Sequence, residues 1–371
     1  MPTAAIREGQ ARVPSPSDSG DLVRRAHGLT ADLAKPNAAI YWTDLLLSAF
    51  VGYGAFAVWF VAGMTYLGLA AAVVSIFALY RCVVFIHELT HLRKRAPRGF
   101  WTGWHVLVGV PLLVPSLFYD GIHNYHHSKA HYGTAADPEY LQLGRGRPLH
   151  IALFILVSPF EPLFLVARFL FVTPFAALVP AVRPYVLERM SAIVMNTSFR
   201  RTELPPFRTA WLVTEIATTI YAWSVAVLVV LGIIPLKAVL MLLVIWSSMS
   251  IIDTLRTLVA HHYENDGQPI DEMAQLLDSV NVPPPAMLPM LWAPTGLRYH
   301  GLHHLLPNLP YHSLGPAHRR LLAKLPADNP YQQTINCGFF EVVARMLRSQ
   351  EKVRRAAESA PPAEKVLAPT R

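Results

Sequence analysis

Histidines are the residues of this 371-residue chain with the clearest chemical potential, because many of them occur in three tight groups. The first group, or box, has the spacing H-x-x-x-H, and the other two have the spacing H-x-x-H-H. On a helix, positions i, i+3 and i+4 lie on one face, so each box aims two or three imidazoles at one point. The eight box histidines are His87, His91, His123, His126, His127, His300, His303 and His304.

Eight imidazoles exceed the needs of a single metal ion. A structural zinc ion takes four ligands, and imidazole also suits copper, iron and nickel. We therefore expect two metal ions to share one histidine-rich site, with the box histidines as their ligands.

His261 is a ninth candidate ligand, because it closely follows a long apolar segment. Asp253, Thr257 and His261 are spaced at i, i+4 and i+8, so a continuous helix would place them on one face. We expect Asp253 and Thr257 to form hydrogen bonds toward the metals, although Asp253 could equally be an ordinary buried polar residue. The neighbouring His262 would face elsewhere, and we expect that it is not a ligand.

Carboxylates close to the boxes could orient the imidazoles and offset the positive charge of the metals. The candidates are Glu88, Asp120, Asp137 and Glu139, with Asn265, Asn308 and His312 as weaker ones. Asp137 follows the second box closely enough to brace it. The histidines that lack box spacing are expected to be ordinary surface or core residues; they are His27, His105, His131, His150, His312 and His318.

The composition indicates an integral membrane protein. Hydrophobic residues make up 53% of the chain and charged residues only 15%, whereas soluble chains average about 25% charged. The mean hydropathy is +0.33, and the apolar residues are gathered into long runs. The net charge of +8 does not indicate nucleic acid, because basic residues in a membrane protein first report topology and contact with anionic lipid.

Two long apolar blocks predict four membrane-spanning helices, since a span needs about 20 residues. We place them near 41–61, 65–86, 209–231 and 237–258, with turns marked by Gly63, Gly232 and Pro235. Two further apolar segments, 100–119 and 150–182, contain Gly or Pro interruptions and are expected to be re-entrant or interfacial. The predicted fold is an all-α integral membrane protein with about four transmembrane helices, interfacial helices and a cytoplasmic, histidine-rich cap.

The basic residues predict the orientation of the chain in the membrane. The turn at 62–65 has no Lys or Arg and the turn at 232–237 has only Lys237, whereas the opposite side carries Arg93, Lys94, Arg95, Arg98, Arg200 and Arg201. The positive-inside rule then places the boxes and His261 on the cytoplasmic face. We also expect flexible tails at 1–38 and 350–371, no cleavable signal peptide, and one functional domain at 39–349.

The boxes and their flanks resemble those of the membrane fatty acid desaturases. The order of the three boxes, divided by apolar blocks, is similar to the order in that family. The resemblance extends to Gly133, Thr134, Asp137 and Pro138 after the second box and to segment 305–312 after the third. It runs from about residue 40 to 325, so we interpret 39–349 as a membrane fatty acid desaturase domain.

This resemblance implies a non-haem di-iron centre that uses O2 to introduce a double bond into a fatty acyl chain, carried by a lipid or a thioester. It further implies that the eight box histidines match the metal ligands of the family and that His261 is an additional ligand. Arg256 and Thr257, which precede Ala260 and His261, resemble the pattern of bacterial members, so we expect a bacterial inner membrane. Related hydroxylases and ketolases use similar histidine-rich di-iron centres, so an oxygenated lipid is the nearest alternative product.

Electrons must come from another protein, because the chain has no H-P-G-G haem motif and no G-x-G-x-x-G fingerprint, and its two cysteines, Cys82 and Cys337, cannot hold an iron–sulfur cluster. We expect a ferredoxin, a rubredoxin or a cytochrome as the donor, together with its reductase. Basic residues could dock such an acidic carrier or anchor the protein at the membrane surface. The candidates are Arg93, Lys94, Arg319 and Arg320.

Two classes outside this family also fit part of the pattern. Residues 87–91 read H-E-x-x-H, the zincin signature, in which Glu88 would be the general base of an intramembrane protease. That interpretation leaves the later boxes and His261 unused. A metal transporter would hold its ligands near the bilayer midplane, whereas these histidines cluster at predicted helix ends.

Overall fold

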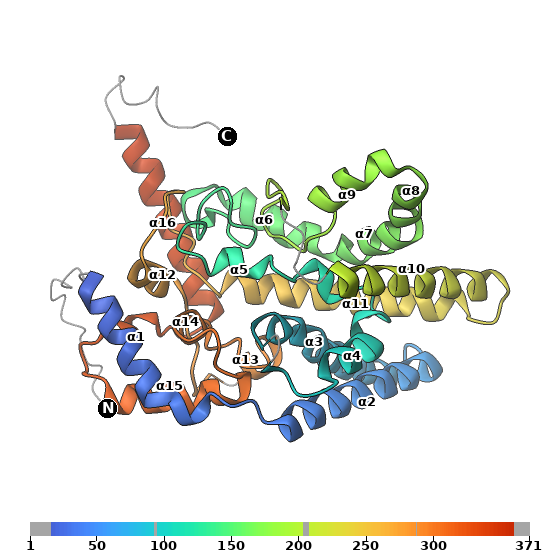
Figure 1. The fold of residues 1–371 in the computed structure, drawn as a ribbon, viewed down its shortest axis with the longest axis horizontal. Helices are drawn as coiled ribbons and strands as arrows, with labels where there is room; N and C mark the ends of the chain where they lie inside the picture. The colour runs from blue at the N-terminus through green and yellow to red at the C-terminus, as the bar shows by residue number, and fades with distance from the viewer. Residues whose placement is uncertain (1–15, 93–94, 203–207, 287, 360–371) are drawn as a thin grey trace.

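The described chain is mostly helical, and its longest helices lie side by side (Figure 1). The computed structural model describes residues 16–92, 95–202, 208–286 and 288–359. Within these ranges helices are the only regular elements, and strand-like pairing is limited to isolated bridges. The predicted all-α class is therefore confirmed.

Four long apolar helices correspond to the four predicted spans. They are α2 (Ala38–Ala62), α3 (Tyr66–Leu92), α10 (Arg208–Val230) and α11 (Leu236–Leu258). Each is long enough to cross the roughly 30 Å hydrocarbon core of a bilayer. The clearest difference from prediction is in α3, which continues beyond the expected end at 86 to Leu92 and so carries the first box on its last turns.

The outward faces of these helices expose large apolar side chains, including those of Phe50, Val61, Val73 and Val230. Contiguous apolar surface of this kind is unfavourable in water. A bilayer removes that penalty, because its hydrocarbon core is the solvent these side chains prefer.

Tight turns join the spanning helices in pairs. Gly63, with φ of 60°, ends α2, and Gly232, with φ of 72°, lies between α10 and α11. Glycine adopts this left-handed conformation without steric cost. Both turns lie at the end of the helices that is distant from the cap, so α3 and α11 deliver their C-terminal ends to the cap (Figure 1).

A short helical hairpin follows α3 and returns to the same side. Its elements are α4 (Phe100–Trp104), the π-helical turn η3 (His105–Gly109) and the 3-10 turn η4 (Ser116–Phe118). Trp104 Nε1 donates to the carbonyl of Cys82 at 2.8 Å, which fixes the hairpin beside α3. The amide of Ser116 donates to His105 Nε2 at 3.1 Å and closes it. This is the predicted re-entrant segment, and it keeps the second box on the side of the first.

A fifth apolar run, of 31 residues, is long enough to cross a membrane by length and composition. It consists of α6 (Pro148–Val157), η6 (Ser158–Phe160), α7 (Glu161–Ala167), η7 (Arg168–Val172) and α8 (Thr173–Leu178). The run contacts both α10 and α11. Ser247 of α11 donates to the Pro159 carbonyl at 2.7 Å, and Arg168 pairs with Glu215 of α10 at 2.7 Å.

The path of this run adds no net crossing. It starts next to η5 (Leu143–Arg145), which packs against helix α16 (Phe339–Ser359). After α8 the chain folds back through η8 (Pro180–Val182) and α9 (Arg183–Arg189), and the amide of Ile193 donates to the Phe118 carbonyl in η4 at 3.0 Å. Since both ends of the run lie on the box side, the arrangement agrees with the interfacial or re-entrant element that was predicted.

The remaining helices gather at the box end and form the cap (Figure 1). They are α1 (Pro16–Thr30), η1 (Ala31–Leu33), α5 (His123–His126), α12 (Glu272–Asp278), α13 (Pro289–Trp292), α14 (His300–Leu305), α15 (Tyr311–Lys324), η9 (Pro330–Thr334) and α16 (Phe339–Ser359). Both described termini lie on this side (Figure 1).

Parts of the two segments expected to be flexible tails are helical. Residues 16–30 form α1, whose Leu22 and Ala26 are buried in a cluster with residues of α12, α14 and α15. Their i, i+4 spacing makes a narrow apolar stripe that the high polarity of the segment conceals. In the same way α16 continues past 350 to Ser359. Residues 1–15 and 360–371 lie outside the described residues.

Candidate metal centre

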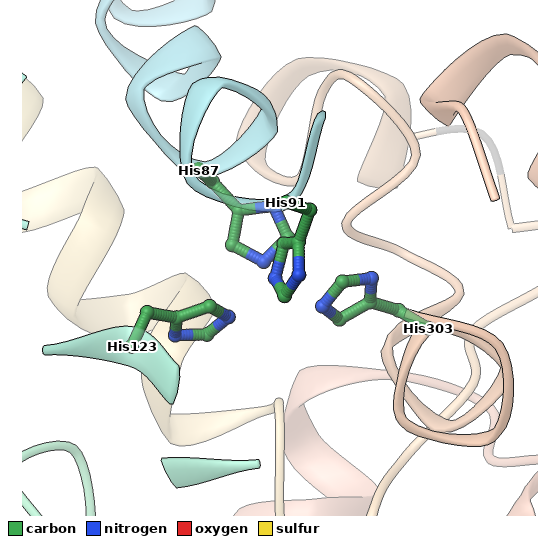
Figure 2. A group of neighbouring side chains, drawn as sticks. All are labelled: His87, His91, His123 and His303. Carbon is green, nitrogen blue, oxygen red and sulfur yellow. The ribbon is translucent and has the colours of Figure 1, made fainter. Parts of the chain in front are cut away.

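The ends of several elements bring the boxes together inside the cap. His87 and His91 occupy the last turns of α3, His123 begins α5, and His303 lies on α14. Figure 2 shows these four imidazoles pointing toward one another from the three elements. His261 lies outside these elements, three residues after Leu258, the last residue of α11.

The first four-histidine group consists of His87, His91, His123 and His303. One ring nitrogen from each lies within 4.8 Å of the others. The ring centres of His87 and His303 are 4.4 Å apart, and those of His87 and His123 are 4.6 Å apart. Nitrogen ligands of a metal sit about 2 Å from it, hence up to about 4 Å from one another. The group could therefore hold one ion after small adjustments.

The second four-histidine group consists of His126, His261, His300 and His304, again with ligand atoms within 4.8 Å of one another. Nε2 of His261 lies 3.0 Å from Nε2 of His126 and 2.8 Å from Nε2 of His300. Nε2 of His304 lies 3.1 Å from that of His300. Nitrogens from four imidazoles thus converge on one point, as the ligands of a second ion would.

His127 lies between the two groups. Its Nε2 is 2.9 Å from Nε2 of His123 and 3.1 Å from Nε2 of His303, both members of the first group. Its ring also stacks on that of His304 in the second group, with centres 4.3 Å apart. A side chain in this position can serve either ion.

His87 gives a direct test of whether a metal fits. Both of its ring nitrogens are buried, and neither has a hydrogen-bond partner among the described residues. A buried polar nitrogen without a partner costs about 1–3 kcal/mol. A cation between His87 and its histidine neighbours would remove that cost, so the donor set fits a metal ion.

The protonation of the cap histidines also suits metal binding. Burial and the neighbouring imidazoles hold the pKa of six of them well below its usual value; these are His123, His127, His261, His300, His303 and His304. The neutral imidazole that results is the form that binds metals.

Asp137 holds His126 from behind. The Nδ1 atom of His126 lies 3.0 Å from Oδ2 and 3.2 Å from Oδ1 of this fully buried carboxylate. Burial opposes a charge on the ring, but Asp137 outweighs it and raises the pKa of His126. With its proton on Nδ1, the ring presents the Nε2 lone pair to the second group.

Glu139 does the same for His123 in the first group. Its Oε1 lies 2.8 Å from His123 Nδ1, and its Oε2 accepts from the Tyr119 hydroxyl at 2.7 Å. Burial raises the pKa of Glu139 to about 7. Asp137 and Glu139 therefore brace one histidine of each group from the same short loop.

His261 is held by groups that the box spacing does not mark. Its Nδ1 lies 2.8 Å from the Tyr132 hydroxyl, which donates to Asp278 Oδ2 at 2.7 Å. The Tyr140 hydroxyl donates to the same oxygen at 2.9 Å. Gln275 Nε2, from the same helix as Asp278, lies 3.0 Å from His304 Nδ1. Sequence reasoning missed these residues because tertiary packing alone brings them to the site.

Glu88 points away from its own box. Its carboxylate accepts from the Tyr41 hydroxyl of α2 and from the Tyr311 amide of α15 at 3.3 Å. It therefore ties α3 to its neighbours instead of contacting a box imidazole. A zincin would need this carboxylate beside a metal-bound water, so the geometry disfavours the protease alternative.

Asp253 and Thr257 do not reach His261, contrary to the spacing argument. α11 ends at Leu258 and the chain turns before His261, so the i, i+4, i+8 face is interrupted. Asp253 instead binds Tyr80 and Arg256. The Thr257 carbonyl accepts from the Tyr263 hydroxyl at 2.7 Å.

The other candidates lie outside both groups. His262 contacts Arg345 at 3.1 Å and belongs to neither four-histidine group. Asn308 accepts from Arg95 through its backbone carbonyl. Asp120 accepts from Ser116, Asn265 caps a local turn and His312 accepts from the Asn37 amide. Of the predicted basic residues, Arg320 pairs with Asp32, and Arg93 and Lys94 lie outside the described residues.

Cavities reach the histidines from two sides. One of about 270 Å³ lies between α3, α7 and α11 and ends at His87. A smaller one of about 80 Å³ shares part of its lining and reaches His126, His261 and His300. On the cap side, a third cavity of about 280 Å³ reaches His127 and His304 and is bordered by α1 and α12.

The fold and this site define the protein as a multi-pass membrane protein with a buried centre suited to two metal ions. The model of the family described as fatty acid desaturase matches residues 64–336. A protein named ceramide hydroxylase, from Caulobacter vibrioides (strain NA1000 / CB15N), is 46% identical over 340 residues, which cover 92% of this chain and 97% of the relative. The chain therefore belongs to the fatty acid desaturase family, a family of di-iron enzymes that oxidise lipids.

This result confirms the family resemblance of the boxes. It weakens the prediction that the protein introduces a double bond, because the similar protein is named as a hydroxylase and not as a desaturase. The hydroxylase alternative therefore gains support over the insertion of a double bond.

Proposed function

We propose that the protein is an O2-dependent di-iron hydroxylase that adds a hydroxyl group to a ceramide-like membrane lipid. The observation that carries this proposal is the 46% identity to a ceramide hydroxylase over nearly the full length of both chains. The two four-histidine groups support it, because they offer the donor set that the reaction needs.

The nine histidines would hold two iron ions, one in each group, with His127 between them. Bound there, the ions would supply the O2-dependent oxidation of an unactivated C–H bond. The net reaction is balanced when R–H, O2, two electrons and two protons give R–OH and water.

The surrounding residues would keep the imidazoles in the ligand form. Asp137 and Glu139 each hold the proton of one ring on its outer nitrogen. Tyr132, with Asp278 behind it, does the same for His261. Outer hydrogen bonds of this kind fix ring orientation and raise metal affinity.

The lipid would enter from the bilayer side. The cavity that ends at His87 is walled by apolar side chains such as Val83, Val84, Trp246 and Met249. These residues lie on α3 and α11, whose outer faces contact lipid, so an acyl chain can occupy the cavity while its polar end approaches the site.

Electrons would come from a separate ferredoxin, rubredoxin or cytochrome with its reductase, as expected from the absence of redox-cofactor motifs in the chain. The cap would face the cytoplasm of a bacterial inner membrane, where such carriers are found. The cavity beside His127 and His304 supports this arrangement, because it opens the centre on the side away from the lipid cavity.

The proposal is tested with the full chain purified in detergent and loaded with iron. The protein is given a ceramide, a ferredoxin–reductase pair and ¹⁸O2, and the lipid product is analysed by mass spectrometry. We expect a product that has gained one labelled oxygen atom, and a metal content of two irons per chain.

The outcomes separate the alternatives. A product that has lost two hydrogens and gained no oxygen would establish desaturation in place of hydroxylation. A single zinc per chain, with no oxidised lipid under any donor, would refute the di-iron assignment.

A further inference from the structure

The lipid cavity contains charged side chains that the metal centre does not use. Among the residues that line the two connected cavities, the ionisable acidic and basic ones apart from histidine and tyrosine are Glu139, Glu161, Asp253 and Arg256. Glu139 is engaged with His123 and Tyr119. The other three lie on α7 and α11, the helices that form the lipid-facing wall. Charges in such a position are costly and usually functional.

Asp253 is arranged to accept further hydrogen bonds. Tyr80 donates to its Oδ1 at 3.0 Å, and Arg256 donates to the same oxygen through Nη2 at 2.9 Å. All its hydrogen bonds to described residues fall on Oδ1, so Oδ2 remains an open acceptor. The Asp253 side chain is 46% exposed, and it lines both cavities.

Glu161 stands opposite on α7. It begins that helix, lines the same two cavities and is exposed. The buried Ser250 lies on α11, as Met249 and Asp253 do, and lines the larger cavity with them. Two carboxyl groups, one guanidinium and one hydroxyl thus line the same cavity as His87.

The other arginines near these helices line neither of the two cavities. Arg168 and Arg183 both pair with Glu215 of α10. Arg201 donates through Nη2 to the backbone carbonyls of Leu117 and Asp120, while its buried Nε and Nη1 have no partner among the described residues. No surplus of positive side-chain charge therefore faces the lipid cavity in the described part of the chain.

We propose that Asp253, with Glu161 and Arg256, binds the uncharged polar head of the lipid and selects against heads that carry phosphate. The inference rests on the proposed function and adds the residues that recognise the lipid head, which offers hydroxyl and amide N–H donors. Carboxylates accept from such donors, and a guanidinium donates to an amide carbonyl. A phosphate is anionic at neutral pH and is repelled by carboxylates. The two carboxylates therefore attract the neutral head and exclude a phosphate-bearing one.

This selection is measured by binding, independently of turnover. The full-length protein in detergent is titrated with a short-chain fluorescent ceramide, which is then displaced by unlabelled ceramide, ceramide 1-phosphate or palmitoyl-CoA. We expect the wild type to prefer ceramide over both phosphate-bearing lipids. In Asp253→Asn and Glu161→Gln the affinity for ceramide should fall about tenfold, as for the loss of one hydrogen bond to a charged group.

The ratio of affinities distinguishes recognition from a structural role. Removal of the carboxylate charge should lower the preference for ceramide over ceramide 1-phosphate in both variants. Glu358→Gln is the matched control, because it removes one exposed carboxylate from α16, and it should leave the ratio unchanged. Metal content in all variants should equal that of the wild type.

Two results would overturn the inference. One is a wild type that binds ceramide 1-phosphate or palmitoyl-CoA as tightly as ceramide. The other is an unchanged affinity ratio in both cavity variants. If the wild type hydroxylates ceramide while either result is obtained, the proposed function stands and the head-recognition site fails. If it oxidises no lipid at all, the proposed function fails separately.

Discussion

Asp137→Asn is the substitution with the most direct consequence for the metal centre. The two oxygens of Asp137 accept from different backbone amides: Oδ2 from Gly133 at 2.8 Å and Oδ1 from Glu139 at 2.8 Å. An asparagine has the same shape but only one oxygen. Whichever way its amide group turns, its NH2 end faces a backbone N–H, and one buried donor loses its acceptor.

The cost has two parts. An unsatisfied buried N–H costs about 1–3 kcal/mol of folding free energy. In addition, His126 loses the charged acceptor on its Nδ1, and changes behind a metal-bound histidine weaken metal affinity by about 10–100-fold. We therefore expect lower thermal stability together with selective weakening of the second ion site, because His126 belongs to that group.

Metal titration of the purified, metal-free protein measures this effect. The wild type should bind two irons, and Asp137→Asn should bind the first normally and the second at a concentration about 10–100-fold higher. Asp328→Asn, at an exposed position, controls for the loss of one negative charge. Two irons bound with wild-type affinity, together with an unchanged unfolding midpoint, would show that Asp137 does not hold a metal ligand.

Three further predictions address the centre, the cavity and the cap. His303→Ala should abolish lipid oxidation and lower the metal content, while the tagged protein still reaches the membrane fraction; full turnover would remove His303 from the site. Met249→Trp should reduce oxidation of long-chain ceramides about tenfold, because the larger side chain overfills the cavity. Mass spectrometry of a mixture of chain lengths should show that short-chain ceramides are less affected. Equal losses for all chain lengths would place the acyl chain elsewhere. Ala26→Asp should release α1 from the cap, because it buries a charge, so limited proteolysis should cut before residue 38 faster than in an Arg25→Ala control; equal cleavage would contradict the observed docking of α1.

Hydropathy, together with the glycine and proline residues that interrupt the apolar blocks, predicted the spanning helices well. A bilayer sets the length and the apolar composition of a spanning helix directly. The turns at Gly63 and Gly232 and the four spans follow from this constraint alone. The cap was harder to predict. α1 carries only a narrow apolar stripe around Leu22 and Ala26. This stripe is buried only because residues of α15 and neighbouring helices pack against it. Composition, averaged over the polar segment, could not reveal that partner.

The boxes predicted a histidine centre, but their division between two groups follows from helix geometry. Successive residues on a helix are separated by about 100°, so His303 and His304 point in different directions and fall into different groups. His300 and His304, spaced at i, i+4, share a group, and so do His87 and His91. Each H-x-x-H-H box can therefore serve both ions. Spacing alone does not decide which neighbour faces which group, because the orientation of α14 against α3 is set by tertiary packing.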